Sequence, residues 1–209
     1  RFLVDILPVL VKEYQVTILA PDFEGSIDYQ RYPWLQQTEI VRFPLFYVQV
    51  GDIYFSNVTY SAVQQHVSSA DIIFNQTLGP IGIFTISAAQ RCKKKVISYV
   101  HSLEWELATK SVKRGKFLAH VLSRLVVRYL YNRCHLLLVP TAEVLEKLSI
   151  LRVKTTKHIL PLGTDAQVFI PAVQKTLAKK ALGFSPSDFV VGFVGRLGRE
   201  KDLTTLYRA

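Results

Sequence analysis

Apolar residues along the chain fall into two alternating patterns. In some segments they recur every three or four residues, which indicates amphipathic helices, and in others they form short runs typical of buried strands. Strands are predicted at 15–21, 39–43, 71–74, 96–100, 135–139 and 158–160, and helices at 2–11, 80–90, 110–133 and 141–148. A stretch at 52–67 is ambiguous and ends in a helix. Near-continuous apolar strands that alternate with helices predict an α/β protein with a doubly wound parallel sheet.

The pattern changes after Pro161. A polar helix is predicted from about Val173 to Leu182, the apolar run 189–194 predicts a new strand, and a further helix begins near Asp202. We therefore expect a first domain over 1–171, a linker over 172–187, and the start of a second α/β domain over 188–209. Because the chain opens inside a helix, we expect the first strand and loop of the first domain to be missing and the second domain to be cut short.

Composition and charge narrow the class of protein. The chain is 49% hydrophobic and 20% charged, which is ordinary for a globular protein. It has no apolar run of about 18 residues and no signal-peptide pattern at its start. Cys92 and Cys134 lie far apart without further metal-ligand spacing, which favours two reduced thiols in a cytoplasmic protein. The net charge of +10 attracts anionic partners, namely phosphates, nucleic acid or lipid headgroups.

A glycine-bearing basic loop follows the last predicted strand. Gly195 allows close approach to the backbone, while Arg196 and Lys201 bring positive charge to the start of the next helix. A diphosphate would fit this arrangement. An equally good alternative is a solvated basic turn in which Lys201 pairs with Glu200 or Asp202.

His101 follows the predicted strand 96–100 directly, at the edge where doubly wound sheets bind their ligands. Its imidazole could donate a hydrogen bond to a sugar hydroxyl or a phosphate oxygen, or titrate near neutral pH. A structural histidine is an equally good explanation from position alone. Glu104 and Glu106 are two residues apart and would face different sides of a helix, which argues against a two-carboxylate hydrolytic site.

The predicted helix 110–133 is basic and amphipathic. Its cations are Lys110, Lys113, Arg114, Lys116, Arg124, Arg128 and Arg133, and its apolar stripe is Phe117, Leu118, Val121, Leu122, Leu125, Val126 and Leu130. Such a helix can lie on an anionic membrane surface. The need to cover the sheet instead favours a helix that packs its stripe into the core and leaves the basic face in solvent. No nucleic-acid-reading motif accompanies the charge, so we expect no nucleic-acid partner.

An ordered series of short motifs runs through the later part of the chain. Its members are Val139-Pro140-Thr141-Ala142, His158-Ile159-Leu160-Pro161-Leu162-Gly163-Thr164-Asp165 with Phe169 and Pro171, Leu182-Gly183, and Val194-Gly195-Arg196-Leu197 with Glu200-Lys201-Asp202. The series resembles the central signature of family-4 glycosyltransferases, which has a "P-S" or "P-T" helix start, then "I-P-N-G-V-D-x-x-x-F-x-P", a linker ending in "L-G", and "V-G-R-L-x-x-E-K-G". The resemblance covers the last 70 residues or so closely and the upstream part more loosely.

The resemblance implies a GT-B fold, in which two Rossmann-like domains face a cleft, and a retaining transfer of sugar from a nucleotide-diphosphate donor. It implies that Arg196 and Lys201, next to Gly195, hold the donor diphosphate, and that His101 contacts the transferred sugar. No cofactor or metal is then required, because cations stabilise the leaving diphosphate. The acceptor would be a lipid, a glycan or a small molecule, and the protein cytoplasmic, with peripheral attachment to the inner membrane face through helix 110–133 as a candidate.

The sequence departs from the family pattern in several places. Leu162, Thr164 and Asp202 replace the usual Asn, Val and Gly, and the glycine-rich loop and the downstream "E-x-x-x-x-x-x-x-E" motif are absent. We therefore expect this stretch alone to be inactive. Two alternatives remain: an α/β module that binds an anionic ligand or a membrane without catalysis, and a GT-B enzyme of other chemistry, such as a sugar-phosphate synthase or an epimerase.

Overall fold

The computed structural model describes residues 2–23, 25, 27–50, 53–112, 115–164, 166–171, 173–195 and 201–208. The chain divides into two units, Arg1–Leu162 and Gly163–Ala209. The division comes after Leu162, before the predicted end of the first domain at residue 171. The predicted residues Arg196 and Asp165 lie outside the described part of the chain.

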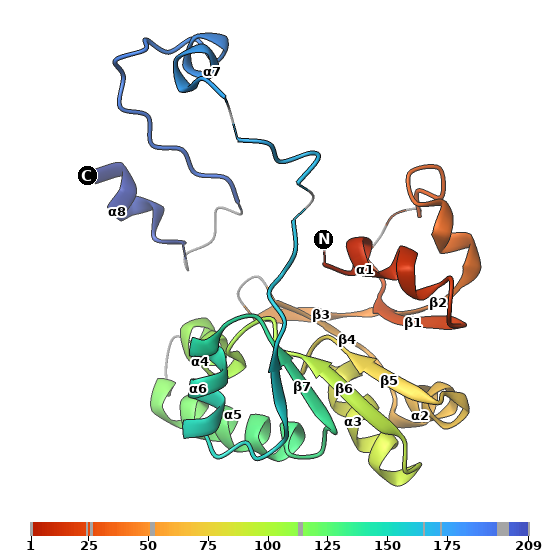
Figure 1. The fold of residues 1–209 in the computed structure, drawn as a ribbon. Coiled ribbons are helices and arrows are strands. Elements are labelled where there is room, and N and C mark those ends of the chain that lie inside the picture. Colours follow the sequence, from red (N-terminus) through yellow and green to blue (C-terminus); the bar gives the residue numbers. More distant parts are fainter. Residues whose placement is uncertain are drawn as a thin grey trace. The chain divides into compact units, whose positions relative to one another are not determined.

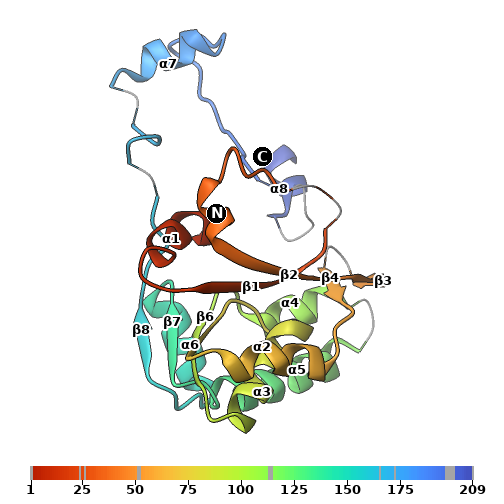
Figure 2. The ribbon, with the colours of Figure 1, turned by 90° about the vertical axis from the view of Figure 1, so that its right-hand side faces the viewer.

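The first unit is built on parallel strands. Strands β1 (Val16–Pro21) and β2 (Thr38–Phe43) pair in parallel, and β5 (Ile72–Asn75), β6 (Lys95–Tyr99), β7 (Leu136–Val139) and β8 (Lys157–Ile159) form a parallel sheet in that order. Figure 1 shows β5, β6 and β7, and Figure 2 shows β6, β7 and β8 next to one another. The predicted α/β fold with parallel sheets is confirmed.

Helix α1 (Phe2–Leu10) precedes β1, and helices connect the strands that follow, because parallel neighbours require a crossover. The connecting helices are α2 (Tyr60–Ser69), α3 (Pro80–Arg91), α4 (Glu104–Ser111), α5 (Lys116–Tyr131) and α6 (Ala142–Ile150), with a short 3₁₀ helix at Pro33–Gln37. Two of them begin at a threonine whose hydroxyl accepts a backbone N–H: Thr59 from Ala62 and Thr141 from Val144. Such caps satisfy backbone donors that a helix leaves unpaired at its start.

One local prediction in the first unit is confirmed and another needs correction. The stretch 52–67 ends in a helix, α2, as predicted, and its ambiguous part contains β4 (Ile53–Ser56), which pairs antiparallel with β3 (Leu45–Val50). The predicted helix 110–133 is wrong as one element, because α4 ends at Ser111 and α5 begins at Lys116. Gly115 precedes α5 in a left-handed conformation with φ 72°, which glycine adopts without a steric penalty and which a continuous helix cannot contain.

The core lies between the four-stranded sheet and the helices that cover it. Its fully buried members are Val96, Val100, Leu137 and Val139 from the sheet region, Val63 from α2, Ile86, Ala88 and Ala89 from α3, and Leu148 from α6. From α5 only Val127, Leu130 and Tyr131 are buried. The prediction that α5 packs its whole apolar stripe into the core is therefore wrong, since Leu130 is the one member of that stripe that is buried.

The second unit contains helices α7 (Lys175–Ala181) and α8 (Leu203–Arg208). The strand predicted at 189–194 is wrong: none of the described residues of this unit forms a strand. A strand requires a hydrogen-bonded neighbour, and the described part of the unit supplies none. Phe189 and Val194 are accordingly almost fully exposed rather than buried.

Candidate functional site

Polar side chains gather where β5 and β6 end. These two strands pair in parallel with Asn75 opposite Ser98, so the residues that follow them emerge at the same edge of the sheet. Gln76 comes directly after β5, and His101 comes two residues after the end of β6. This edge is where ligands bind in open α/β sheets, which makes it the candidate site.

His101 is held by a residue from each of the two strand ends. Its Nε2 lies 2.7 Å from Oε1 of Gln76. Its ring lies against the ring of Tyr99, with centroids 4.5 Å apart and planes tilted by 36°. Tyr99 is itself anchored, because its hydroxyl donates to the carbonyl of Leu160 just after β8, at 2.8 Å. The imidazole is thus positioned by contacts that span the sheet edge from β5 to β8.

The protonation of His101 follows from this packing. The residue as a whole is exposed, yet its ring is partly covered, and the partial burial lowers the pKa of His101 below its usual value. Burial disfavours the charged form of an imidazole. The neutral ring, with one nitrogen as donor and the other as acceptor, is therefore favoured near neutral pH.

The loop that carries Gln76 is fixed by a small hydrogen-bond network. Asn75 Nδ2 donates to the carbonyl of Thr77 at 2.9 Å and to the hydroxyl of Ser98 at 3.2 Å. The hydroxyl of Thr77 accepts the N–H of Gly79 at 3.1 Å, immediately before α3. A Cβ at Gly82 in the first turn of α3 would lie 1.7 Å from the Thr77 carbonyl oxygen, so only glycine allows this approach.

Gln76 has a second, unsatisfied group. Its Nε2 is buried and has no hydrogen-bond partner among the described residues. A buried N–H group without a hydrogen-bond partner destabilises the folded protein. Such a group in a native structure is a reason to consider a functional role for the residue. Sequence analysis missed Gln76, although the criterion that selected His101, a polar residue just beyond a buried strand, applies equally to it.

Glu104 and Glu106 lie apart, as their spacing predicted. Glu104 points into the core, where its Oε1 accepts the hydroxyl of Tyr131 at 2.7 Å and its Oε2 has no partner among the described residues. Burial raises the pKa of Glu104 to about 7 and that of Tyr131 well above its usual value. Glu106 instead pairs with Lys147 of α6 at 3.2 Å. The two carboxylates therefore do not share one site.

The predicted donor-binding residues belong to the second unit. Gly195 and Lys201 are exposed, while Arg196 lies outside the described residues. Asp202, offered as a partner of Lys201, accepts a hydrogen bond from the hydroxyl of Thr205 at 2.8 Å. The role of the loop in holding a diphosphate stays a prediction.

Neither a metal cluster nor a membrane span occurs in the described part of the chain. Among those residues, no three His, Cys, Asp or Glu side chains come close enough together to hold a metal ion. None of the helices there is long and apolar enough to cross a membrane. Cys134 is buried and Cys92 half-buried, and both are free thiols.

Comparison with known proteins agrees with the motif resemblance and extends it upstream. The family described as Glycosyltransferase Family 4 matches residues 1–168, which include β1 to β8, Gln76 and His101. No curated protein matches the chain. The match covers well over half of the chain and includes the parallel sheet and the polar residues beyond the carboxyl ends of its strands. The protein therefore belongs to glycosyltransferase family 4.

Proposed function

We propose that this protein transfers a sugar from a nucleotide-diphosphate donor to an acceptor hydroxyl, with retention of anomeric configuration. In such a transfer the bond between the anomeric carbon and the diphosphate breaks, a new bond forms to the acceptor oxygen, and the acceptor hydroxyl gives its proton to an oxygen of the departing diphosphate. Negative charge collects on the leaving diphosphate, so the site must supply positive charge or hydrogen-bond donors there. Family membership supports a transferase, and the described geometry supports a particular place for the sugar.

The observation that carries the proposal is the pairing of His101 with Gln76. A neutral imidazole whose single N–H is engaged by a neighbour can accept a hydrogen bond from a sugar hydroxyl with its other nitrogen. Gln76 fixes the tautomer of His101, because its amide oxygen can only accept, so Nε2 of His101 donates to it and Nδ1 is left as the acceptor. His101 would therefore contact the transferred sugar, and Gln76 would act as a positioning residue.

The basic loop of the second unit would stabilise the negative charge on the leaving diphosphate. Arg196 and Lys201 would contact the diphosphate, and Gly195 would let its oxygens approach the backbone. Two full positive charges can carry out the stabilisation that a divalent metal provides in other transferases. We accordingly expect donor binding without an added metal ion.

The test is calorimetric titration of the full-length protein with a panel of nucleotide diphosphates and their sugars. Tight binding of one nucleotide, lost in an Arg196→Ala, Lys201→Ala variant, would support the donor site and identify the base. His101→Ala should keep nucleotide binding but lose sugar transfer by about a hundredfold or more, the range of a positioned polar group at a reacting centre. An absence of binding to every nucleotide would overturn the proposal and favour a module without catalysis.

A further inference from the structure

The outward face of α5 is apolar, the reverse of what a helix on a protein surface normally shows. Phe117 is 82% exposed, and six further apolar residues of the same helix are exposed: Leu118, Val121, Leu122, Leu125, Val126 and Tyr129. At 3.6 residues per turn these seven residues occupy one half of the helix surface, opposite Val127, Leu130 and Tyr131, which face the core. We call this set of seven the α5 face.

Cations line one side of the α5 face and no carboxylate belongs to it. Lys116 begins the helix, Arg124 and Arg128 lie along one side of the face, and α5 contains no acidic residue. The ion pairs formed among the described residues join Arg42 to Asp22 and Lys147 to Glu106 and Glu143, so none of them neutralises α5. The face thus combines exposed apolar side chains with uncompensated positive charge.

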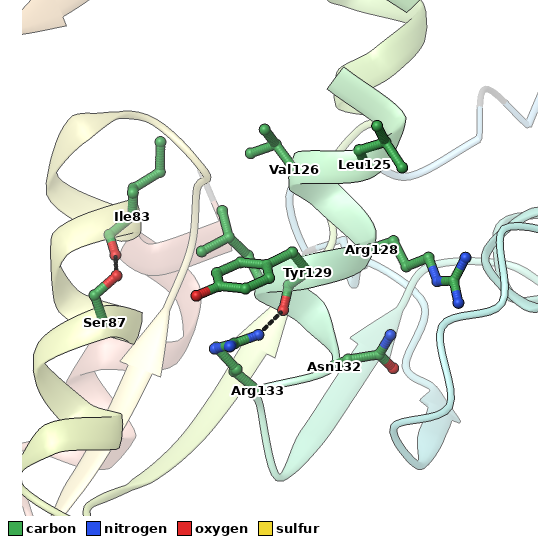
Figure 3. Close-up of a pocket in the computed structure, with 9 residues that line it drawn as sticks. Ile83, Ser87, Leu125, Val126, Arg128, Tyr129, Asn132 and Arg133 are labelled. Atoms are coloured by element: carbon green, nitrogen blue, oxygen red, sulfur yellow. Dashed lines mark hydrogen bonds between the residues drawn. The ribbon is translucent and has the colours of Figure 1, made fainter. Parts of the chain in front are cut away.

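An open depression of about 720 Å³ lies beside α5 on the side of α3. Figure 3 shows Ile83 and Ser87 of α3 facing Val126 and Tyr129 of α5 across it. The guanidinium of Arg133 stacks at 3.3 Å from the centre of the Tyr129 ring and donates to the Tyr129 carbonyl at 3.0 Å. The lining of this depression is therefore mostly apolar, with a cation at one end.

A second open depression, of about 400 Å³, lies on the other side of α5, next to α6. The residues that line it include the apolar Phe117 and Ile150 and the cationic Arg124, Arg128 and Arg152. Figure 3 shows Arg128 extending from α5 away from Tyr129. Three guanidiniums beside apolar side chains match a phospholipid, whose phosphate adjoins its acyl chains.

We propose that the α5 face docks on the surface of a bilayer that contains anionic phospholipid. The exposed apolar residues enter the boundary between headgroups and acyl chains, with the helix parallel to the membrane plane. Arg124, Arg128 and Arg152 contact lipid phosphates, and the net charge of +10 attracts the whole chain to the surface. This inference is independent of the sugar-transfer proposal, since it uses none of the residues assigned to the donor or to the sugar.

Charge decides between a bilayer and a second copy of the chain. A symmetric dimer through the α5 face would bring the arginines of both copies together in a protein that is already strongly positive, and like charges at an interface oppose association. An anionic lipid surface neutralises the same arginines while it buries the same apolar side chains. The charge pattern therefore favours lipid.

The test is co-sedimentation of the protein with vesicles of phosphatidylcholine alone and of phosphatidylcholine mixed with phosphatidylglycerol. We expect strong binding to the mixed vesicles, weak binding to phosphatidylcholine alone, and weaker binding as salt is added. Phe117→Ser with Leu122→Ser should lower the partition coefficient roughly tenfold or more. The triple variant Arg124→Gln, Arg128→Gln, Arg152→Gln should lower the partition coefficient by a similar factor for the mixed vesicles, but not for phosphatidylcholine alone.

Matched controls distinguish binding through the α5 face from nonspecific hydrophobic or electrostatic binding to the vesicles. Val9→Ser with Tyr14→Ser removes two other exposed apolar side chains, and Lys12→Gln with Arg91→Gln and Lys95→Gln removes the same charge elsewhere. Both controls should bind vesicles nearly as the wild type does, and circular dichroism should show every variant folded. Equal losses in controls and α5 variants, or no wild-type binding to mixed vesicles, would overturn the proposal. So would dimerisation in solution that the α5 variants abolish.

Discussion

The side chains of Gln76 and His101 meet at 2.7 Å, although they are 25 residues apart in the sequence. The contact exists because β5 and β6 are parallel neighbours whose carboxyl ends lie at the same edge of the sheet. Parallel pairing thus places two polar residues, each of which follows a different strand, close enough to form a hydrogen bond.

Replacing Gln76 by Glu should raise the pKa of His101. The amide is neutral, and in its place a carboxylate would favour the imidazolium, opposing the lowering that burial causes. The measurement is an NMR titration of the His101 ring protons in wild type and Gln76→Glu. Gln76→Ala serves as the control that removes the contact without adding charge. An identical titration midpoint in wild type and Gln76→Glu would contradict the contact.

Gly82→Ala should destabilise the first unit. The added Cβ would lie 1.7 Å from the Thr77 carbonyl oxygen, so the loop 76–79 or the start of α3 must move. Overpacking of this kind typically costs about 1–3 kcal/mol. The measurement is the urea midpoint of unfolding, with Gly163→Ala as the control, since a Cβ at Gly163 meets nothing within 4 Å. Equal midpoints for the two variants would show that the loop does not approach α3 so closely.

Glu104 should make stability fall as pH rises. Burial raises its pKa in the folded state from 4.5 to about 7, so between these values the folded protein holds a proton that the unfolded chain releases. A shift of this size corresponds to roughly 3 kcal/mol of stability present at low pH and lost as pH rises to about 7. Urea unfolding of wild type and Glu104→Gln from pH 5 to pH 8 measures it. Glu104→Gln should remove this slope, whereas the exposed Glu146→Gln should retain it.

Gly115→Ala should destabilise α5 at its start. Gly115 has φ 72°, a left-handed conformation that costs a residue with a Cβ roughly 1–2 kcal/mol. If instead the chain responds by joining α4 and α5 into one helix, its helical circular dichroism will rise. Thermal unfolding monitored at a helical wavelength distinguishes the two results. A variant with unchanged stability and unchanged helicity would contradict the observed break.

Local sequence determined most of the first unit of this protein. The strands at 71–74, 96–100 and 135–139 were predicted to within a residue of β5, β6 and β7, because buried parallel strands are apolar on both faces and contrast with the helices around them. The position of His101 after such a strand identified it as a candidate, and the ordered motifs indicated the family to which residues 1–168 belong.

Tertiary structure decided the features that depend on partners distant in the sequence. The run 189–194 is apolar enough for a strand, but strand formation needs hydrogen bonds to a neighbour that the described second unit does not provide. The Gln76–His101 contact required the register of β5 and β6. The apolar periodicity of α5 showed that one face is apolar, but not whether that face meets the sheet or solvent, because only the packing of α5 through Val127, Leu130 and Tyr131 sets its rotation.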